Sequence, residues 1–487
     1  MVGMFSAAIV MHAESDFERM CHEMTEHSLP LVNLTVATSR LSKYYYIKGH
    51  ITIADPQQRT DGQTIFDADC NLRYRGGTSL SYAKKSFAIK LIDKDGNDLD
   101  AHVLGIREEN SWILDAMAID RARMRNRVLF DIWNEASVTP WGTKHNNRNG
   151  TQGFFVEVFL NGAYHGLYCM TDKIDRKLLG LKKPIVNDDK VTVRGLQYKC
   201  DNWTTAAVFG GYDATARVDT TYWNGFELKV PENYPSIDTW RPLMDIINIT
   251  RKSYASLKNE YQNWFYKENL IDYMTFVLAF RITDNSIKNT YMSTVDITQD
   301  KRFIFTPWDL DATLGGSWDG KWENATSTWR LMGATVIYRK LYDGNVGGFA
   351  DDLHRRWVEL RSSIFSTRNL EKKMNFYATQ LQRSGAWQRE RSKWNGKPVP
   401  LDESPFYWTK EIPAWYERNI TAVNTLLGTP TGDVDMNGVV NGSDITTFYN
   451  LLLTGDESDF LPACDVDMNG IVNGSDVTAL YSLLINR

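Results

Sequence analysis

A tandem repeat at the C-terminal end of the chain constrains the fold more than any other feature of the sequence. GDVDMNGVVNGSDITTFYNLLL begins at Gly432 and CDVDMNGIVNGSDVTALYSLLI begins at Cys464, so equivalent residues lie 32 positions apart. A repeat of this length indicates a duplicated supersecondary unit. The stretch Gly-Thr-Pro-Thr-Gly, residues 428–432, precedes it and is typical of a domain boundary. We therefore expect residues 428–487 to form a small domain of their own.

Each repeat has the spacing of a calcium-binding loop. Oxygen-bearing side chains occupy loop positions 1, 3, 5, 9 and 12, a glycine occupies position 6, and position 7 can offer its carbonyl. Calcium takes about six to eight hard oxygen ligands, which this spacing supplies. Apolar residues at helical spacing follow each loop and predict one helix apiece. Two Asx-rich turns are the alternative, but both copies keep every ligand position. The predicted ligands are Asp433, Asp435, Asn437, Val439, Asn441 and Asp444 in the first loop, and Asp465, Asp467, Asn469, Ile471, Asn473 and Asp476 in the second.

The repeat differs from an ordinary EF-hand in two respects. Its loops end in aspartate where an EF-hand has a bidentate glutamate, and Pro430 disfavours an entering helix. Both departures resemble the type I dockerin, over roughly residues 432–487. The resemblance implies two bound calcium ions and, as partner, a cohesin domain of a scaffold protein. Dockerins commonly carry Ser-Thr-like pairs at loop positions 10 and 11, where this chain has Gly442-Ser443 and Gly474-Ser475.

The overall composition narrows the class of protein. A chain of 487 residues is too long for one ordinary core, and 43% hydrophobic with 24% charged residues is typical of a soluble globular protein. The net charge of −5 gives no reason to expect nucleic acid as a partner. No stretch is long and apolar enough to predict a membrane span. Five widely separated cysteines without CxxC spacing exclude the usual thiolate zinc site and a disulfide-dense scaffold.

Upstream of the repeat, a mostly β half precedes a mostly α half. Short alternating runs predict strands over residues 30–100, and an Asn161-Gly162 turn between two apolar runs predicts a hairpin over residues 154–170. We expect two lobes with a cleft between them, preceded by residues 1–29 as a tail or the remnant of a signal peptide. The other predicted elements are a helix over residues 112–135, a strand over 224–232, helices from Ile237 onward and a strand over 302–306.

Two aspartates follow the last of these strands. Asp309 and Asp311 stand in PWDLDATLGG, and a carboxylate pair at the end of a buried strand is a common way to hold a metal–phosphate. An aspartate-capped turn is the alternative. Upstream, Asp284 and Asn289 follow an apolar helix over residues 270–280 and have the D-x-x-x-x-N spacing of a kinase catalytic loop. In that loop the aspartate accepts the substrate proton and the asparagine binds a metal.

A kinase also needs a lysine on an N-terminal strand. Phe87-Ala-Ile-Lys90 has the form of the V-A-I-K motif, and strand alternation places Lys90 on the same face as Ala88 and Ser86. Lys85 competes with Lys90 for contact with the phosphates. Arg75 opens a Gly-Gly-Thr-Ser stretch whose backbone N–H groups could bind phosphate.

Together these segments resemble the CotH-type spore-coat kinases, over most of residues 30–425. The resemblance implies an α+β, atypical protein-kinase-like two-lobed domain over residues 30–427, with the dockerin-like all-α domain after it. It implies phosphorylation of protein serine or threonine that depends on ATP with magnesium or manganese. Asp284 is then the base and Asp309 the metal ligand, with Asn289 and Asp311 as further ligands. The matching stretches are residues 75–91, 120–126 and 156–175, FELKVPE, TDNSIKNTY and TPWDLDATLG.

Two functional hypotheses follow. The first is a secreted or cell-surface bacterial kinase tethered through its dockerin to a cohesin-bearing scaffold. The second is a non-catalytic binding component of a cellulosome-like extracellular complex. A glycan-active module, suggested by 16 tryptophans, is disfavoured because no carboxylate pair singles out a glycosidase.

Overall fold

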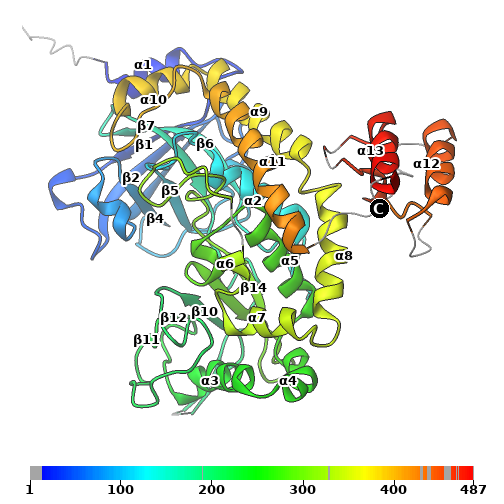
Figure 1. Ribbon diagram of the computed structural model, residues 1–487. Helices are drawn as coiled ribbons and strands as arrows, with labels where there is room; N and C mark the ends of the chain where they lie inside the picture. Colours follow the sequence, from blue (N-terminus) through cyan, green and yellow to red (C-terminus); the bar gives the residue numbers. More distant parts are fainter. Residues whose placement is uncertain are drawn as a thin grey trace, which may run out of the picture. The chain divides into compact units, whose positions relative to one another are not determined.

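The computed structural model describes residues 14–188, 190–326, 329–427, 432–435, 440–454, 462–467, 469 and 471–485 (Figure 1). Its α+β composition and its helical C-terminal region agree with expectation. The chain divides into two compact units. Unit 1 contains the chain up to Ala118 together with Gly153–Asp172 and Gln380–Glu403, and unit 2 contains Ile119–Gln152, Lys173–Thr379 and Ser404–Arg487.

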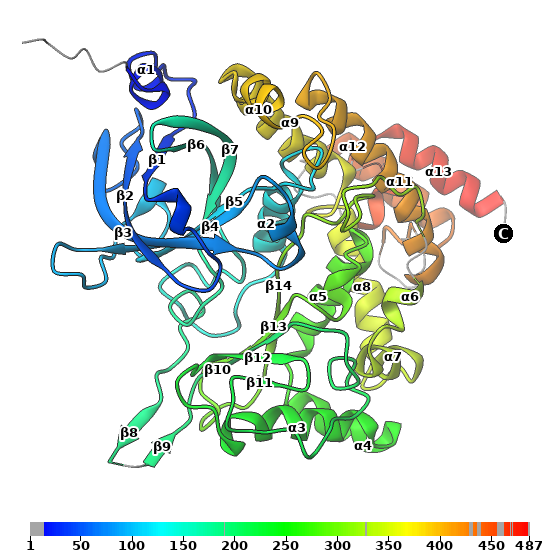
Figure 2. The same ribbon diagram turned by 90° about the vertical axis from the view of Figure 1, so that its left-hand side faces the viewer.

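Unit 1 is built on a closed seven-stranded barrel, which the sequence did not lead us to expect (Figure 2). The strand order is β1-β2-β3-β4-β5-β7-β6, and β1 closes the barrel by pairing in parallel with β6. The other neighbouring strands are antiparallel. The strands are β1 (Leu31–Thr35), β2 (Ile47–Ala54), β3 (Ile65–Arg75), β4 (Ser86–Ile92), β5 (Ser111–Asp115), β6 (Gly153–Leu160) and β7 (Ala163–Thr171).

The predicted hairpin over residues 154–170 is confirmed as β6 and β7. Its two turn residues, Asn161 and Gly162, have φ of +52° and +80°, as a type I′ turn requires. The Asn161 side chain also accepts a hydrogen bond from Val36 N (2.8 Å) and donates to Val36 O (2.9 Å). The turn is therefore tied to the end of β1.

The prediction of a helix over residues 112–135 is wrong in its first part. Trp112, Ile113 and Leu114 are buried in strand β5, and helix α2 covers only Arg125–Ala136. A short apolar run fits a buried strand as well as a buried helix, and periodicity alone does not separate them.

Two helices of unit 1 pack on the β6–β7 hairpin. Helix α1 (Asp16–His22) contacts it through Phe17, whose ring lies 5.4 Å from that of Phe159. Helix α10 (Ala386–Trp394) is joined to it by the Trp394 indole, which donates to His165 O (2.7 Å).

Unit 2 contains a five-stranded antiparallel sheet in the order β11-β12-β10-β13-β14 (Figure 2). The expectation of a mostly α second half is thus incomplete. Strands β12 and β14 are the two strands predicted here, and they form a sheet with β10, β11 and β13, which were not predicted. Tyr198 of β10 stacks on Trp240 of helix α3 (Ile237–Arg251), with ring centres 5.5 Å apart, which packs the sheet against that helix. The strands are β10 (Leu196–Cys200), β11 (Tyr222–Trp223), β12 (Phe226–Val230), β13 (Thr290–Thr294) and β14 (Ile304–Pro307).

Helices occupy most of the chain from Ile237 to Leu427, as expected. A separate two-stranded hairpin, β8 (Ile185–Asn187) with β9 (Lys190–Thr192), precedes the sheet. The helices in this region besides α10 are α3 (Ile237–Arg251), α4 (Tyr254–Glu260), α5 (Lys267–Ala279), α6 (Trp329–Met332), α7 (Val336–Asp343), α8 (Phe349–Arg361), α9 (Thr367–Arg383) and α11 (Trp408–Leu427).

In the C-terminal region each predicted calcium loop leads into a helix, α12 (Gly442–Thr454) and α13 (Gly474–Ile485). Phe448 and Leu480, one from each helix, are fully buried in a shared apolar cluster. All five cysteines are free thiols, and four of them are buried. Among the described helices, none carries a segment long and apolar enough to cross a membrane.

Candidate functional site

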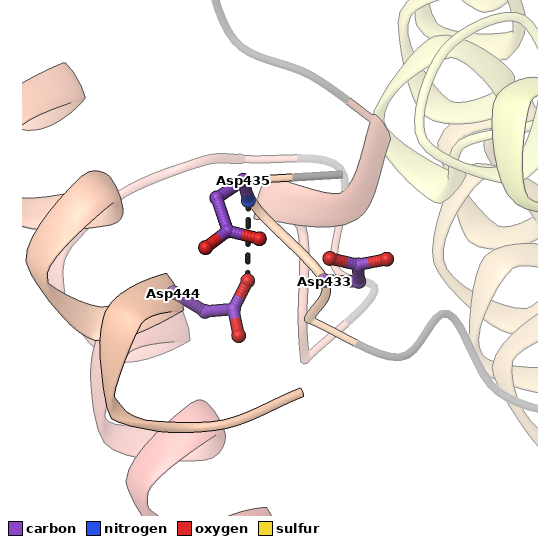
Figure 3. Close-up of side chains that lie close together, drawn as sticks. All are labelled: Asp433, Asp435 and Asp444. Carbon is purple, nitrogen blue, oxygen red and sulfur yellow. Dashed lines mark hydrogen bonds between the residues drawn. The ribbon is translucent and has the colours of Figure 1, made fainter. Parts of the chain in front are cut away.

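The carboxylates of each predicted calcium loop gather at one point. In the first loop Asp433, Asp435 and Asp444 each bring an oxygen within 4.8 Å of the others (Figure 3). Asp465, Asp467 and Asp476 do the same in the second loop. Three carboxylates and nearby amide oxygens form a donor set of hard oxygens, which fits calcium.

The last aspartate of each loop orders the loop backbone. Asp444 accepts hydrogen bonds from Asp435 N (3.1 Å) and Asn441 N (2.8 Å). In the second loop Asp476 accepts from Asp467 N (3.1 Å) and Asn473 N (2.9 Å). The two loops therefore share one backbone arrangement, although their sequences are separated by a helix.

Electrostatics in the second loop favour a cation. Burial and the nearby charge of Asp467 raise the pKa of Asp476, so the carboxylates repel one another. Among the other predicted ligands, Asn437 and Val439 lie outside the described residues. Asn441 caps α12 by accepting a hydrogen bond from Ser443 N. In the second loop, Asn473 accepts from Ser475 N and Asn469 accepts from Ile471 N.

A second candidate site lies at one edge of the sheet in unit 2. The register of β13 and β14 pairs Thr290 with Pro307, so the residue before β13 meets the residues after β14. Accordingly, Asn289 Nδ2 donates to Asp309 Oδ2 at 3.4 Å. Both residues have left-handed backbone, with φ of +58° and +61°. The structure thus brings together two of the residues singled out from the sequence.

Asn285, which was not predicted from the sequence, links Asp284, the predicted base, to this edge of the sheet. Its side-chain amide donates to Trp308 O (2.8 Å) and accepts from Trp308 N (3.0 Å). Asn285 follows Asp284 and Trp308 precedes Asp309, and neighbouring Cα atoms are about 3.8 Å apart. Asp284 and Asp309 are therefore held at the same edge of the sheet. In the sequence, Asn285 stands between Asp284 and Ser286, a pattern that indicates a turn but not a contact with Trp308.

The loop after Asp309 is held by α2. Leu310 N donates to Asn126 Oδ1 at 3.1 Å. Asp120 fixes the start of this helix by accepting from Met124 N and Arg125 N, each at 2.8 Å. The Arg125 guanidinium is buried and pairs with the Asp120 carboxylate. Arg125 is therefore part of the support for this loop.

The carboxylates of this site differ in exposure. Asp309 is exposed, whereas Asp284 and Asp311 are half-buried. Carboxylate and amide oxygens at one edge of a sheet are ligands that Mg²⁺ prefers, often together with substrate phosphates. Asp309, Asp311 and Asn289 are therefore the residues of this site that could hold magnesium with a nucleotide.

The cations predicted to contact phosphates all belong to unit 1. Lys90 is exposed on β4, unlike the buried Ser86 and Ala88 on the same strand face, and its ammonium lies 5.2 Å from the centre of the Tyr46 ring. Lys85 is half-buried and donates to Tyr82 O (2.7 Å). Arg75 ends β3 and is half-buried.

A buried ion pair in unit 1 escaped sequence reasoning. Lys84 Nζ lies 2.6 Å from Glu390 Oε1, and both side chains are fully buried. The ammonium also donates to Leu167 O, and Glu390 Oε2 accepts from Leu167 N (2.8 Å). The sequence offered no glutamate to pair with a lysine here, because the two partners are 306 residues apart.

The histidine beside this pair is held neutral. Burial, assisted by the positive charge of Lys84, lowers the pKa of His165 to about 4. Its ring stacks on Tyr168 and meets the Trp394 ring edge-on. The pair therefore lies among aromatic rings, away from bulk water.

Comparison with protein families agrees with both resemblances. A family model described as CotH kinase protein matches residues 72–425. The chain belongs to the CotH kinase protein family. A second model, described as Dockerin type I domain, matches residues 431–485. A search of curated proteins found no match.

In the CotH region of the chain, the residue after β7 takes part in a second buried network. Asp172 accepts from Arg107 Nε (2.9 Å), and Arg107 also pairs with Glu109 (2.8 Å). All three side chains are buried. The Arg107 guanidinium is thus balanced by two buried carboxylates.

The dockerin match explains why carboxylates gather in each of the two loops. Type I dockerin domains bind calcium and pair with cohesin domains. Such modules occur in extracellular cellulosome proteins. The CotH region and the dockerin therefore combine a kinase-like domain with a docking module.

Proposed function

We propose that this protein is an exported CotH-type kinase, anchored to a cohesin-bearing scaffold by its calcium-loaded dockerin. It transfers the γ-phosphoryl group of ATP to serine or threonine hydroxyls of a protein. A kinase-like arrangement of two lobes is part of this proposal. The contact between Asn289 and Asp309, with the Asn285–Trp308 clamp beside it, is the observation that carries it.

The roles follow the order of these residues. Asp309, with Asn289 and Asp311, provides oxygen ligands for magnesium, which supplies charge neutralisation for the phosphates when it is bound. Asp284 orients the substrate hydroxyl and accepts its proton as the hydroxyl oxygen bonds to the γ-phosphorus. The bond from that phosphorus to the β–γ bridging oxygen breaks, and ADP leaves.

We also assign Lys84 and Glu390 as the lysine–glutamate pair that protein kinases require. This assignment differs from the expectation for Lys90, because of these three lysines (Lys84, Lys85 and Lys90) Lys84 is the one that pairs with a carboxylate in the described part of the chain. Lys85, Lys90 and Arg75 remain candidates for direct contact with phosphates. Nucleotide titrations of Lys84→Met, Lys85→Ala and Lys90→Ala rank the three lysines.

The deciding experiment compares two substitutions in the full chain. Asp309→Asn should abolish magnesium-dependent ATP binding and phosphoryl transfer together, because it removes the charge that holds the metal. Asp284→Asn should leave ATP binding within about twofold while transfer falls by about 10²–10⁴-fold, the scale for a positioned base. ATP binding is measured by calorimetry, and transfer by labelled phosphate on the protein itself and on candidate proteins.

Asp319→Asn is the matched control, because Asp319 lies in the same segment but pairs with Lys321 and Ser317. It should keep both properties. A wild-type protein that binds magnesium–ATP but transfers phosphate no faster than Asp284→Asn would support the non-catalytic scaffold instead.

A further inference from the structure

Helix α5 carries two buried polar side chains that contact the segments of the candidate site in unit 2. The helix packs beside β14, the strand that leads to Asp309 (Figures 1 and 2). The two side chains are Asn269 and Tyr273, and both are buried. Residues four apart lie on one face of a helix, one turn from each other. We therefore examined what each of them holds.

Asn269 holds β14. Its side-chain oxygen accepts from Phe305 N (2.6 Å), and its side-chain nitrogen donates to Phe305 O (3.1 Å). An amide that bonds both backbone groups of one strand residue fixes where that residue lies along the strand. The strand that leads to Asp309 is thus placed relative to α5.

Tyr273 holds the loop of the predicted base. Its hydroxyl donates to Asn285 O (2.9 Å) and lies 2.7 Å from Thr290 Oγ1, from which it can accept. Asn285 follows Asp284, and Thr290 follows Asn289. One hydroxyl therefore contacts both ends of the loop that carries these two predicted site residues.

The Tyr273 hydroxyl lies in a dry part of the core. The ring is packed edge-on against Trp133 and Phe305, with ring centres 5.8 and 5.4 Å away. Burial raises the pKa of Tyr273, so the phenol stays protonated and can donate. Asn285 and Thr290 are buried as well. When one partner of such a bond is removed, water does not readily replace it.

The two ends of the loop differ in their other anchors. At one end, Asn289 N donates to Cys200 O of β10 (2.9 Å), a contact that does not involve Tyr273. At the other end the anchor is Asn285, whose main-chain oxygen accepts from Tyr273 and whose side chain forms the clamp after β14. Loss of the Tyr273 hydroxyl should therefore displace Asp284 more than Asn289.

We propose that Tyr273 is a positioning residue for phosphoryl transfer, whose hydroxyl holds Asp284, through Asn285, in the place where it accepts the substrate proton. Tyr273 is buried, so it acts through the loop and not on the substrate. Together with Asn269 it makes α5 the common frame for the segments that carry the base and the metal ligand. The effect on catalysis rests on the proposed function, whereas the hold on the loop does not.

The kinetic test compares two tyrosine-to-phenylalanine substitutions in the full-length protein. Tyr273→Phe should lower kcat by about 10- to 100-fold, the scale of a slightly misplaced catalytic group, while the KM for ATP stays within about twofold. Tyr338→Phe is the matched control and should change neither. Tyr338 is also buried and packs on Phe305, but its hydroxyl has no hydrogen-bond partner in the part of the chain that the structure describes. Equal losses in the two variants would overturn the inference.

Thr290 offers a conservative pair of variants on the same hydroxyl network. Thr290→Ser keeps the hydroxyl beside Tyr273 and should keep kcat within about twofold of the wild type, whereas Thr290→Val removes it at similar volume and should lower kcat. Combined with Tyr273→Phe, Thr290→Val should add less than its own loss, because both substitutions break one network. Strictly multiplicative losses would show that the two hydroxyls act separately and would contradict the shared hold on the loop.

Amide hydrogen exchange tests the hold on the loop without phosphoryl transfer. Trp308 N donates to Asn285 Oδ1 (3.0 Å), so its exchange reports on the position of Asn285. Relative to amides of β12, it should be about fivefold faster in Tyr273→Phe, the scale of one lost hydrogen bond, and unchanged in Tyr338→Phe.

The two measurements separate the possible failures. Unchanged exchange at Trp308 in Tyr273→Phe would overturn the inference, and so would faster exchange with an unchanged kcat. If the wild type transfers no phosphate while this exchange still responds, the proposed function is wrong and the hold of Tyr273 on the loop is supported.

Discussion

The calcium loops and the Lys84–Glu390 pair show two opposite ways of building a polar site. The carboxylates of the first loop all come from residues 433–444 and face one another across a few ångströms. Lys84 and Glu390 are separated by 306 residues and meet only because the barrel and α10 pack together. The residues of the first site lie in one contiguous stretch of sequence, whereas the two residues of the second come together only in the folded chain.

The two sites also differ in how they are neutralised. Each calcium loop gathers like charges, and neither loop sequence contains a lysine or an arginine. The ion pair is internally neutral, and both of its members are fully buried. We therefore expect calcium to control the fold of the dockerin, while unit 1 responds to changes in its own side chains.

The largest expected effect is the unfolding of the dockerin on removal of calcium. Calcium at a thousandfold excess over its Kd stabilises the folded state by about 4 kcal/mol per site. With EDTA, residues 432–485 should lose their cooperative melting transition, as measured by calorimetry of the full chain. The transition of the CotH region should stay within about 2 °C.

Asp444→Asn and Thr446→Ala form the matched pair for this prediction, because the Thr446 hydroxyl donates to Gly442 O and not to a loop carboxylate. The first removes a loop carboxylate and should raise the calcium concentration needed for folding. The second keeps every carboxylate and should not. A dockerin transition that is the same in EDTA and in calcium would contradict the ligand assignment.

The next largest effect is expected at the buried ion pair. Glu390→Leu leaves the Lys84 ammonium buried without its counter-ion, which destabilises unit 1 by about 3–5 kcal/mol. Chemical denaturation followed by tryptophan fluorescence measures the change. The double variant Lys84→Met, Glu390→Leu should recover much of the loss, because it removes the buried charge as well.

The exposed pair Arg217–Asp219 provides the control. Asp219→Asn should leave the denaturation midpoint unchanged. Equal effects at the buried and exposed pairs would show that burial does not determine how much stability an ion pair contributes.

The same contrast explains what could be predicted from the sequence. Local signals gave the β6–β7 hairpin, the helices from Ile237 and the loop carboxylates, because each depends on residues a few positions apart. The barrel closes through the parallel pairing of β1 with β6, which no local pattern encodes. The kinase-like spacing also assigned Asn289 and Asp309 to one site, although strand β13, which sets their contact, was not predicted. The Asn285 clamp and Glu390 were not predicted, since their partners are set by packing.

A smaller effect should arise from His165, which reports on the surroundings of the ion pair. Its pKa is about 4 in the folded protein and about 6.5 when unfolded. Between these values the unfolded chain binds a proton that the folded chain does not, so the free energy of unfolding falls as pH falls. The loss amounts to up to about 3 kcal/mol by pH 4.

Denaturation curves at several pH values compare the wild type with His165→Gln. The variant should lose this part of the pH dependence below pH 6.5. His102→Gln removes an exposed histidine and should leave the pH dependence intact. A pH dependence in His165→Gln as steep as in the wild type would show that other groups govern the acid stability of unit 1.

The smallest expected effect on stability tests the clamp between Asn285 and Trp308. Asn285→Leu keeps the approximate volume but leaves the backbone N–H and C=O of Trp308 without partners, and this loss destabilises unit 2 by about 2 kcal/mol. Because the clamp holds Asp284 near Asp309, phosphoryl transfer should fall by more than the loss of folded protein explains, at temperatures where the variant is folded. Asn248→Leu, at an exposed position of α3, is the matched control and should change neither quantity. If Asn285→Leu lost stability but kept full transfer, the clamp would support the fold of the sheet edge without positioning the two aspartates.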